Sequence, residues 1–125
     1  MRRRGGYTGG ALMIGLFWGR TRNKFDGDQE NKRTSDLVTV RLHEKFIEEF
    51  GSVTCREIHD GLFGRRFDLW SDADKESFEQ AGAHRDKCTR LVALAALWTA
   101  ELILGELEKK GLARDELEKL RFVEP

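Results

Sequence analysis

The sequence has a single proline, Pro125, which is the last of its 125 residues. No proline therefore interrupts a helix, and chain breaks fall to glycine and to helix-capping residues. Two cysteines are too few for the disulfide framework of a small secreted domain, which favours a cytoplasmic protein with reduced or reactive thiols. The charges of the 22 basic and 22 acidic residues cancel, so the net charge gives no indication that the protein binds nucleic acid.

Long apolar runs are also missing. The longest, LVALAALWTAELIL at residues 91–104, has 14 residues, whereas a membrane-spanning helix needs about 20. It is expected to be a core or oligomer-interface helix, and no membrane span is predicted. The N-terminus resembles a signal peptide in its arginines and short apolar run at residues 11–18. That run contains Gly15, lacks a small-x-small cleavage site and is followed by Arg20 and Arg22, so a buried helix is favoured.

The hydrophobic pattern predicts an all-α single domain, a compact bundle of five to six helices with no sheet. Residues 1–7 are expected to form a flexible basic N-terminus and residues 20–34 a polar connection. The expected helices span residues 8–19, 35–50, a short segment after Ser52, 71–80, 85–110 and 114–122. The helix at residues 8–19 has almost no polar face, which predicts burial on most sides.

The helix at residues 35–50 carries the clearest amphipathic stripe, whose members are Val38, Leu42, Phe46 and Phe50, widened by Leu37, Val40 and Ile47. Ser35 is its expected N-cap and Gly51 its expected C-terminal glycine. Ser71, with Asp74 three residues later, predicts a capped helix start.

Cysteine and histidine residues occur in two reversed pairs. Cys55 precedes His59 by four residues, and His84 precedes Cys88 by four. Residues four apart share one helix face, so two facing pairs would supply a tetrahedral Cys2His2 zinc site. Alternatively, each cysteine is a small buried apolar residue, or the two thiols near helix starts form a reactive pair. The partial positive charge of a helix N-terminus, with Arg56, Arg85 and Lys87 nearby, lowers the pKa of a thiol placed there.

Three segments in order resemble one protein family: GGYTGGALMIGLFWGRT at 5–21, FIEEFGSVTCREI at 46–58 and KCTRLVALAALWTAELI at 87–103. Together they resemble the C_GCAxxG_C_C family of redox-active, four-cysteine helical proteins, over residues 4–107. The resemblance makes Cys55 the third family cysteine and Cys88 the fourth. Arg4 stands at the cysteine of the family's CGAxxG motif, and the first family cysteine lies in a segment N-terminal to this sequence.

The resemblance implies thiol redox chemistry, or handling of zinc or an iron–sulfur cluster, through Cys55 and Cys88. It also implies a redox protein partner. One alternative is a helical interaction module that has lost this chemistry and buries its apolar faces in a homo-oligomer. The other is the structural zinc protein, with Cys55, His59, His84 and Cys88 as ligands. Whether the chain is an enzyme is left open.

Overall fold

The computed structural model describes residues 5–111. Every regular element in this range is helical and none is a strand, which confirms the all-α prediction. The elements are α1 (Gly5–Trp18), a 3₁₀ turn (Arg22–Lys24), α2 (Gln29–Phe50), α3 (Cys55–Phe63), α4 (Asp72–Gln80), a π-helical turn (Ala83–Lys87) and α5 (Cys88–Lys109). The helix expected at residues 114–122 lies outside the described residues.

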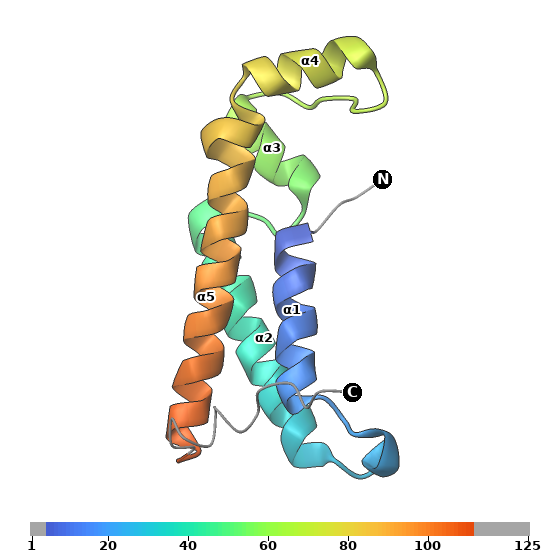
Figure 1. Ribbon diagram of the computed structural model, residues 1–125, viewed down its shortest axis with the longest axis vertical. Helices are drawn as coiled ribbons and strands as arrows, with labels where there is room; N and C mark the ends of the chain where they lie inside the picture. Colours follow the sequence, from blue (N-terminus) through green and yellow to red (C-terminus); the bar gives the residue numbers. More distant parts are fainter. Residues whose placement is uncertain (1–4, 112–125) are drawn as a thin grey trace, which may run out of the picture.

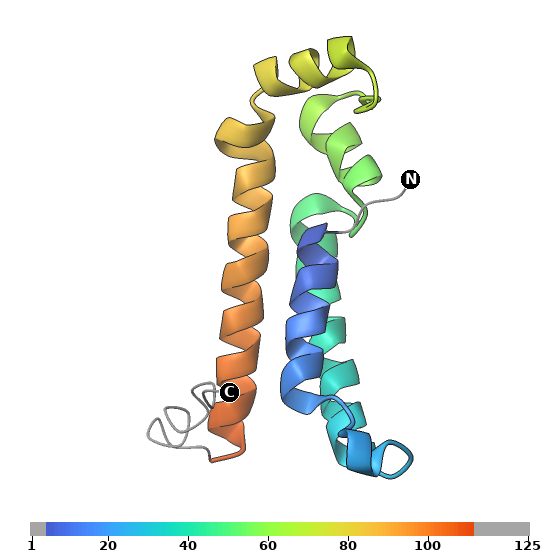
Figure 2. The ribbon, with the colours of Figure 1, turned by 45° about the vertical axis from the view of Figure 1, so that its right-hand side comes forward.

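The three long helices, α1, α2 and α5, pack against one another along the length of the molecule. The two short helices, α3 and α4, lie together at one end of this three-helix bundle (Figures 1 and 2). The prediction of an all-α bundle is therefore confirmed, but the prediction that all five to six helices pack into one compact bundle is wrong. The short helices extend the bundle instead of joining it, and we refer to α3, α4 and the segment between them as the head.

The helix α2 is longer at its N-terminus than expected, because it begins at Gln29 and not near Ser35. Asp28 occupies the N-cap position, and the Thr34 hydroxyl donates to the carbonyl of Glu30 inside the helix. The expected polar connection at 20–34 therefore shrinks to residues 19–28. The C-terminal end is as predicted, with Gly51 in the left-handed conformation at φ 73° and its N–H bonded to the Ile47 carbonyl.

The core of the bundle follows the predicted stripe on α2. Val38, Leu42 and Phe46 are almost fully buried, as their i+4 spacing indicates. Buried residues of the other helices pack against them: Ile14, Trp18, Ile58, Leu91, Ala95, Ile103 and Leu107. The predicted widening of the stripe is wrong, because Leu37, Val40 and Ile47 are exposed. The helix has only two long neighbours, so its buried face is narrow.

The helix α1 differs from expectation at both its start and its outer surface. It begins at Gly5, so residues 5–7, expected to be flexible, are helical. Only Gly10, Ile14 and Trp18 are buried. The predicted burial on most sides is wrong, because α1 lies on one side of the bundle and contacts only α2 and α5 closely.

The helical stretch Ala83–Lys109 is, within the described residues, the one segment long and apolar enough to cross a membrane. The apolar run itself, residues 91–104, is shorter than a membrane span, but the helical stretch continues beyond it at both ends. Core helices of soluble proteins meet the same criterion of length and composition. Here only 22% of the most apolar window is buried, so much of this helix faces outward.

Candidate functional site

Cys55 is the first residue of α3. Thr54, in extended conformation, occupies the N-cap position that the sequence assigned to Ser52. The Ser52 hydroxyl instead accepts from the Thr54 backbone N–H at 3.1 Å and donates to the Glu57 carboxylate. Ile58, buried in the core, fixes the orientation of α3. This packing leaves Cys55 half-buried at the junction between the bundle and the head.

Cys88 is the first residue of α5, which begins three residues later than the expected start at Arg85. The five residues Ala83–Lys87 form a π-helical turn after Gly82, whose φ of 91° reverses the chain leaving α4. Isolated π-helical turns are uncommon, and they are frequent at functional sites. As a result, Cys88 also lies half-buried between the head and the bundle.

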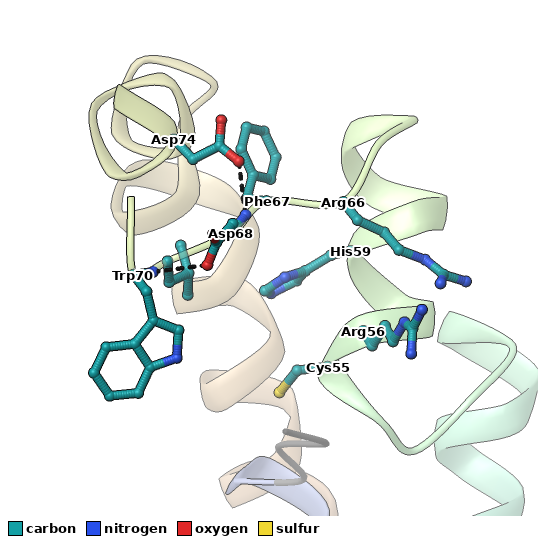
Figure 3. A pocket seen from close by; sticks show the side chains of 9 residues that line it. Cys55, Arg56, His59, Arg66, Phe67, Asp68, Trp70 and Asp74 are labelled. Carbon is teal, nitrogen blue, oxygen red and sulfur yellow. Dashed lines mark hydrogen bonds between the residues drawn. The ribbon is translucent and has the colours of Figure 1, made fainter. Parts of the chain in front are cut away.

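The structure brings His59 of α3 and Cys88 of α5 into contact, with 3.6 Å between Cys88 Sγ and His59 Nε2. Cys55 lies one helical turn before His59 on α3, and its charge is among the causes that raise the pKa of the Cys88 thiol. Figure 3 shows Cys55 and His59 extending from the same side of α3 toward α5. Both cysteines are free thiols.

An aromatic cluster surrounds the His59 ring. Its centroid lies 5.5 Å from that of Phe63 and 5.1 Å from that of Phe78, and Phe67 makes edge-on contacts with both phenylalanines. Burial in this cluster lowers the pKa of His59, and the neighbouring Asp60 carboxylate offsets part of the effect. A histidine with a lowered pKa is neutral at neutral pH, so His59 can accept a proton there.

The pKa of Cys88 is raised, which is opposite to the expectation from its helix N-terminus. Burial is the main cause, and the negative charges of Cys55 and Glu79 add to it. Desolvation therefore outweighs the helix dipole and the nearby Lys87. Cys88 is a protonated thiol at neutral pH, and its S–H can donate to His59 Nε2.

His84 does not join these three residues. Its side chain is exposed, and its Nδ1 atom contacts the Glu79 carboxylate. Among residues 5–111, no group of three or more His, Cys, Asp or Glu side chains is arranged to hold a metal ion. The predicted Cys2His2 ligand set of Cys55, His59, His84 and Cys88 is thus not assembled in this structure.

A pocket of about 440 Å³ opens beside Cys55 and His59, between α3 and the segment that leads to α4. Figure 3 shows the side chains that line it. The segment is held by Asp74, whose carboxylate accepts from the Asp68 N–H at 2.7 Å and from Arg65 at 3.0 Å. These two donors lower the pKa of Asp74. The Ser71 N-cap, accepting from the Asp74 N–H as predicted, fixes the start of α4.

Arg56, Arg66 and Trp70 also line the pocket, and of these only Arg56 was predicted to act on the nearby thiol. Arg66 pairs with Asp60 at 2.8 Å across the turn after α3. Trp70 has 83% of its surface exposed, which is unusual for a tryptophan. Two arginines and an exposed indole around a thiol suit a ligand with a carboxylate and an apolar part. Arg56, adjacent to Cys55, was the one signal present in the sequence.

Comparison with known proteins gives one family match. The model of the family described as "Putative redox-active protein (C_GCAxxG_C_C)" matches residues 5–102. No curated protein and no solved structure gives a significant match. Because the family match covers more than half of the chain, this protein belongs to the C_GCAxxG_C_C family.

Proposed function

We propose that this protein is a dithiol–disulfide oxidoreductase that uses Cys55 and Cys88 as a redox pair. The observation that carries the proposal is the contact of the Cys88 thiol with a neutral imidazole, with 3.6 Å between Cys88 Sγ and His59 Nε2, while Cys55 lies one helical turn before His59 on α3. The family match supports redox chemistry in general. The pocket beside Cys55 supports access for a substrate.

The roles of the two thiols follow from their access to this pocket. Cys55 lines the pocket and is therefore the thiol that a substrate disulfide reaches first. Its thiolate attacks one sulfur of the substrate, forms a mixed disulfide and displaces the other half of the substrate as a thiolate, which takes a proton from water. Arg56 and Arg66 lie where they can bind a carboxylate of that substrate.

Cys88 resolves the mixed disulfide. Its raised pKa keeps it protonated until His59 Nε2 accepts the proton. The resulting Cys88 thiolate attacks the Cys55 sulfur, and the second substrate thiolate leaves with the proton that His59 returns. Two protein thiols are oxidised to one disulfide, while the substrate disulfide is reduced to two thiols. A redox protein partner would then reduce the Cys55–Cys88 disulfide by the reverse exchange.

The experiment is thiol trapping with oxidised glutathione, followed by mass spectrometry of the intact protein. Wild type is expected to lose two hydrogens without retaining glutathione, because Cys88 displaces it. Cys88→Ser is expected to accumulate one glutathione on Cys55, whereas Cys55→Ser reacts far more slowly. If both wild-type thiols resist glutathione and alkylation until the protein is denatured, the proposal is wrong.

The zinc hypothesis and the cytoplasmic location stay predictions. For zinc, the side chain of His84 would have to leave Glu79 and turn toward Cys88. A non-redox interaction module is favoured by a separate observation, the exposed apolar faces of α1 and α5. Those faces are compatible with a redox role, since they do not include Cys55 or Cys88.

A further inference from the structure

A groove of about 550 Å³ runs between α1 and α5, separate from the thiol pocket. Many of the residues that line it are small: Gly10, Ala95 and Thr99 are buried, whereas Gly9, Ala96 and Ala100 are exposed. Larger apolar residues, among them Met13 and Phe17, form its sides. The helix α1 has no Asp, Glu, Lys, Arg or His, so the whole groove wall on that side is uncharged.

The glycines of α1 fall into two groups. Gly6 and Gly10 face the bundle, where an added Cβ would come within 2.9 Å of Leu91 Cδ2 and 2.5 Å of Thr99 Oγ1, respectively. Close packing within the chain explains why glycine occupies these two positions. At Gly5, Gly9 and Gly15 an added Cβ meets nothing within 4 Å, and of these three only Gly5 and Gly9 line the groove.

An interior glycine destabilises a helix relative to alanine, and no contact in the described part of the chain offsets this at Gly9. A glycine on a helix surface lets another backbone approach closely. The outward glycines at the groove therefore leave room for a second helix to lie against α1 at this point.

The rim of the groove is strongly apolar and exposed. Leu12 and Leu16, one helical turn apart, are 68% and 79% exposed and form a ridge beside Met13 and Phe17. Met13, Phe17, Val92 and Leu104 line the groove, and with Leu12, Leu16 and Leu97 they make seven large exposed apolar side chains on α1 and α5. Together they expose on the order of 700 Å² of apolar surface, close to the roughly 800 Å² that each partner contributes to a standard interface.

We propose that the occupant of this groove is a second copy of the chain. The helix α1 carries both a ridge, Leu12 and Leu16, and one wall of a groove. A two-fold axis places the ridge of each copy in the α1–α5 groove of the other, which is the self-complementary arrangement of a symmetric dimer. A lipid surface would cover the same apolar side chains, but it requires neither a concave surface nor outward glycines. The proposal does not depend on the thiol chemistry.

The test is the mass of the full chain in solution, measured by sedimentation over a range of micromolar concentrations. Wild type is expected to be a dimer, and Leu16→Glu is expected to raise the dissociation constant by about 30-fold or more. Leu37→Glu is the matched control, because Leu37 is 55% exposed on α2 and lies outside the groove. Its dissociation constant is expected to equal that of wild type.

A second variant, Gly9→Ala, separates the interface from folding. The added methyl group meets nothing in its own chain, so helicity is expected to be kept or increased while dimerisation weakens. The proposal is overturned if wild type is a monomer, including one that sediments with phosphatidylcholine vesicles. It is also overturned if Leu37→Glu weakens association as much as Leu16→Glu, or if both leave it unchanged.

Discussion

Substitution of Gly10 by alanine is the sharpest test of how α1 packs into the bundle. Gly10 is buried where α1 contacts both α2 and α5. A Cβ atom at this position would lie 2.5 Å from Thr99 Oγ1 and 2.6 Å from Leu42 Cδ2. Ordinary contacts of this kind are 3.4–4 Å, so α1 or its neighbours must move.

Neither neighbour has room to move. Leu42 is completely buried in the core, and the Thr99 hydroxyl donates to the Ala95 carbonyl at 2.7 Å. Overpacking of a well-packed interior costs about 1–3 kcal/mol. The gain in helix propensity from glycine to alanine is about 1 kcal/mol and acts in the opposite direction. We therefore expect Gly10→Ala to destabilise the protein by up to about 2 kcal/mol.

Gly15→Ala is the matched control on the same helix, because an added Cβ there meets nothing within 4 Å. It should raise the free energy of unfolding by about 1 kcal/mol through helix propensity alone. Urea unfolding followed by circular dichroism, at one fixed protein concentration, gives both values. If Gly10→Ala is as stable as Gly15→Ala, the close packing of α1 described here is wrong.

Four further predictions follow from the core, the head and the site. Phe46→Ala, in the centre of the core, should lower the free energy of unfolding by about 3–5 kcal/mol in urea titrations. Ser71→Ala should cost about 1 kcal/mol in the same assay, because it removes the N-cap of α4; no change would mean that the cap is not formed. Burial lowers the pKa of His59 in the folded protein below its ordinary value of 6.5. As the pH falls through 6.5, the unfolded chain therefore binds more protons than the folded protein does. The free energy of unfolding should therefore decrease as the pH is lowered from neutral toward the pKa of His59 in the folded protein. The decrease should be smaller in His59→Gln, and identical pH dependence in the two proteins would contradict this. Finally, EDTA should leave the melting temperature unchanged, since His84 faces Glu79; a large decrease would restore the zinc hypothesis.

The sequence predicted those parts of the fold that have a local cause. The spacing of Val38, Leu42 and Phe46 identified the buried face of α2, and Gly51 and Ser71 marked helix ends by their capping chemistry. It did not predict which apolar residues stay exposed. Leu37 and Leu16 are as apolar as their buried neighbours, and only the number and position of the packed helices decide their burial.

The site was predictable in its residues but not in its contacts. The spacing of Cys55 and His59 placed both on one helix face, yet the thiol that His59 contacts is Cys88 of another helix. The approach of the two cysteines was implied by the family resemblance and not by their spacing. The π-helical turn that positions Cys88 has no local signature, and burial reversed the expected direction of the Cys88 pKa.

Because of the position of the head, the proposed disulfide would restrain its motion relative to the bundle. The helix α3 makes few close backbone contacts with other elements, and the head extends beyond the bundle (Figure 2). Such a unit can open locally while the bundle stays folded. A bond between Cys55 and Cys88 would tie the first residue of α3 to the first residue of α5 and close a loop that contains the whole head. In the chain-entropy treatment this closure restrains the opened head by ~3–4 kcal/mol. On oxidation, amide hydrogen exchange would then slow in α3 and α4 and stay constant in α1 and α2. A partner could therefore distinguish the two redox states by the rigidity of one end of the molecule.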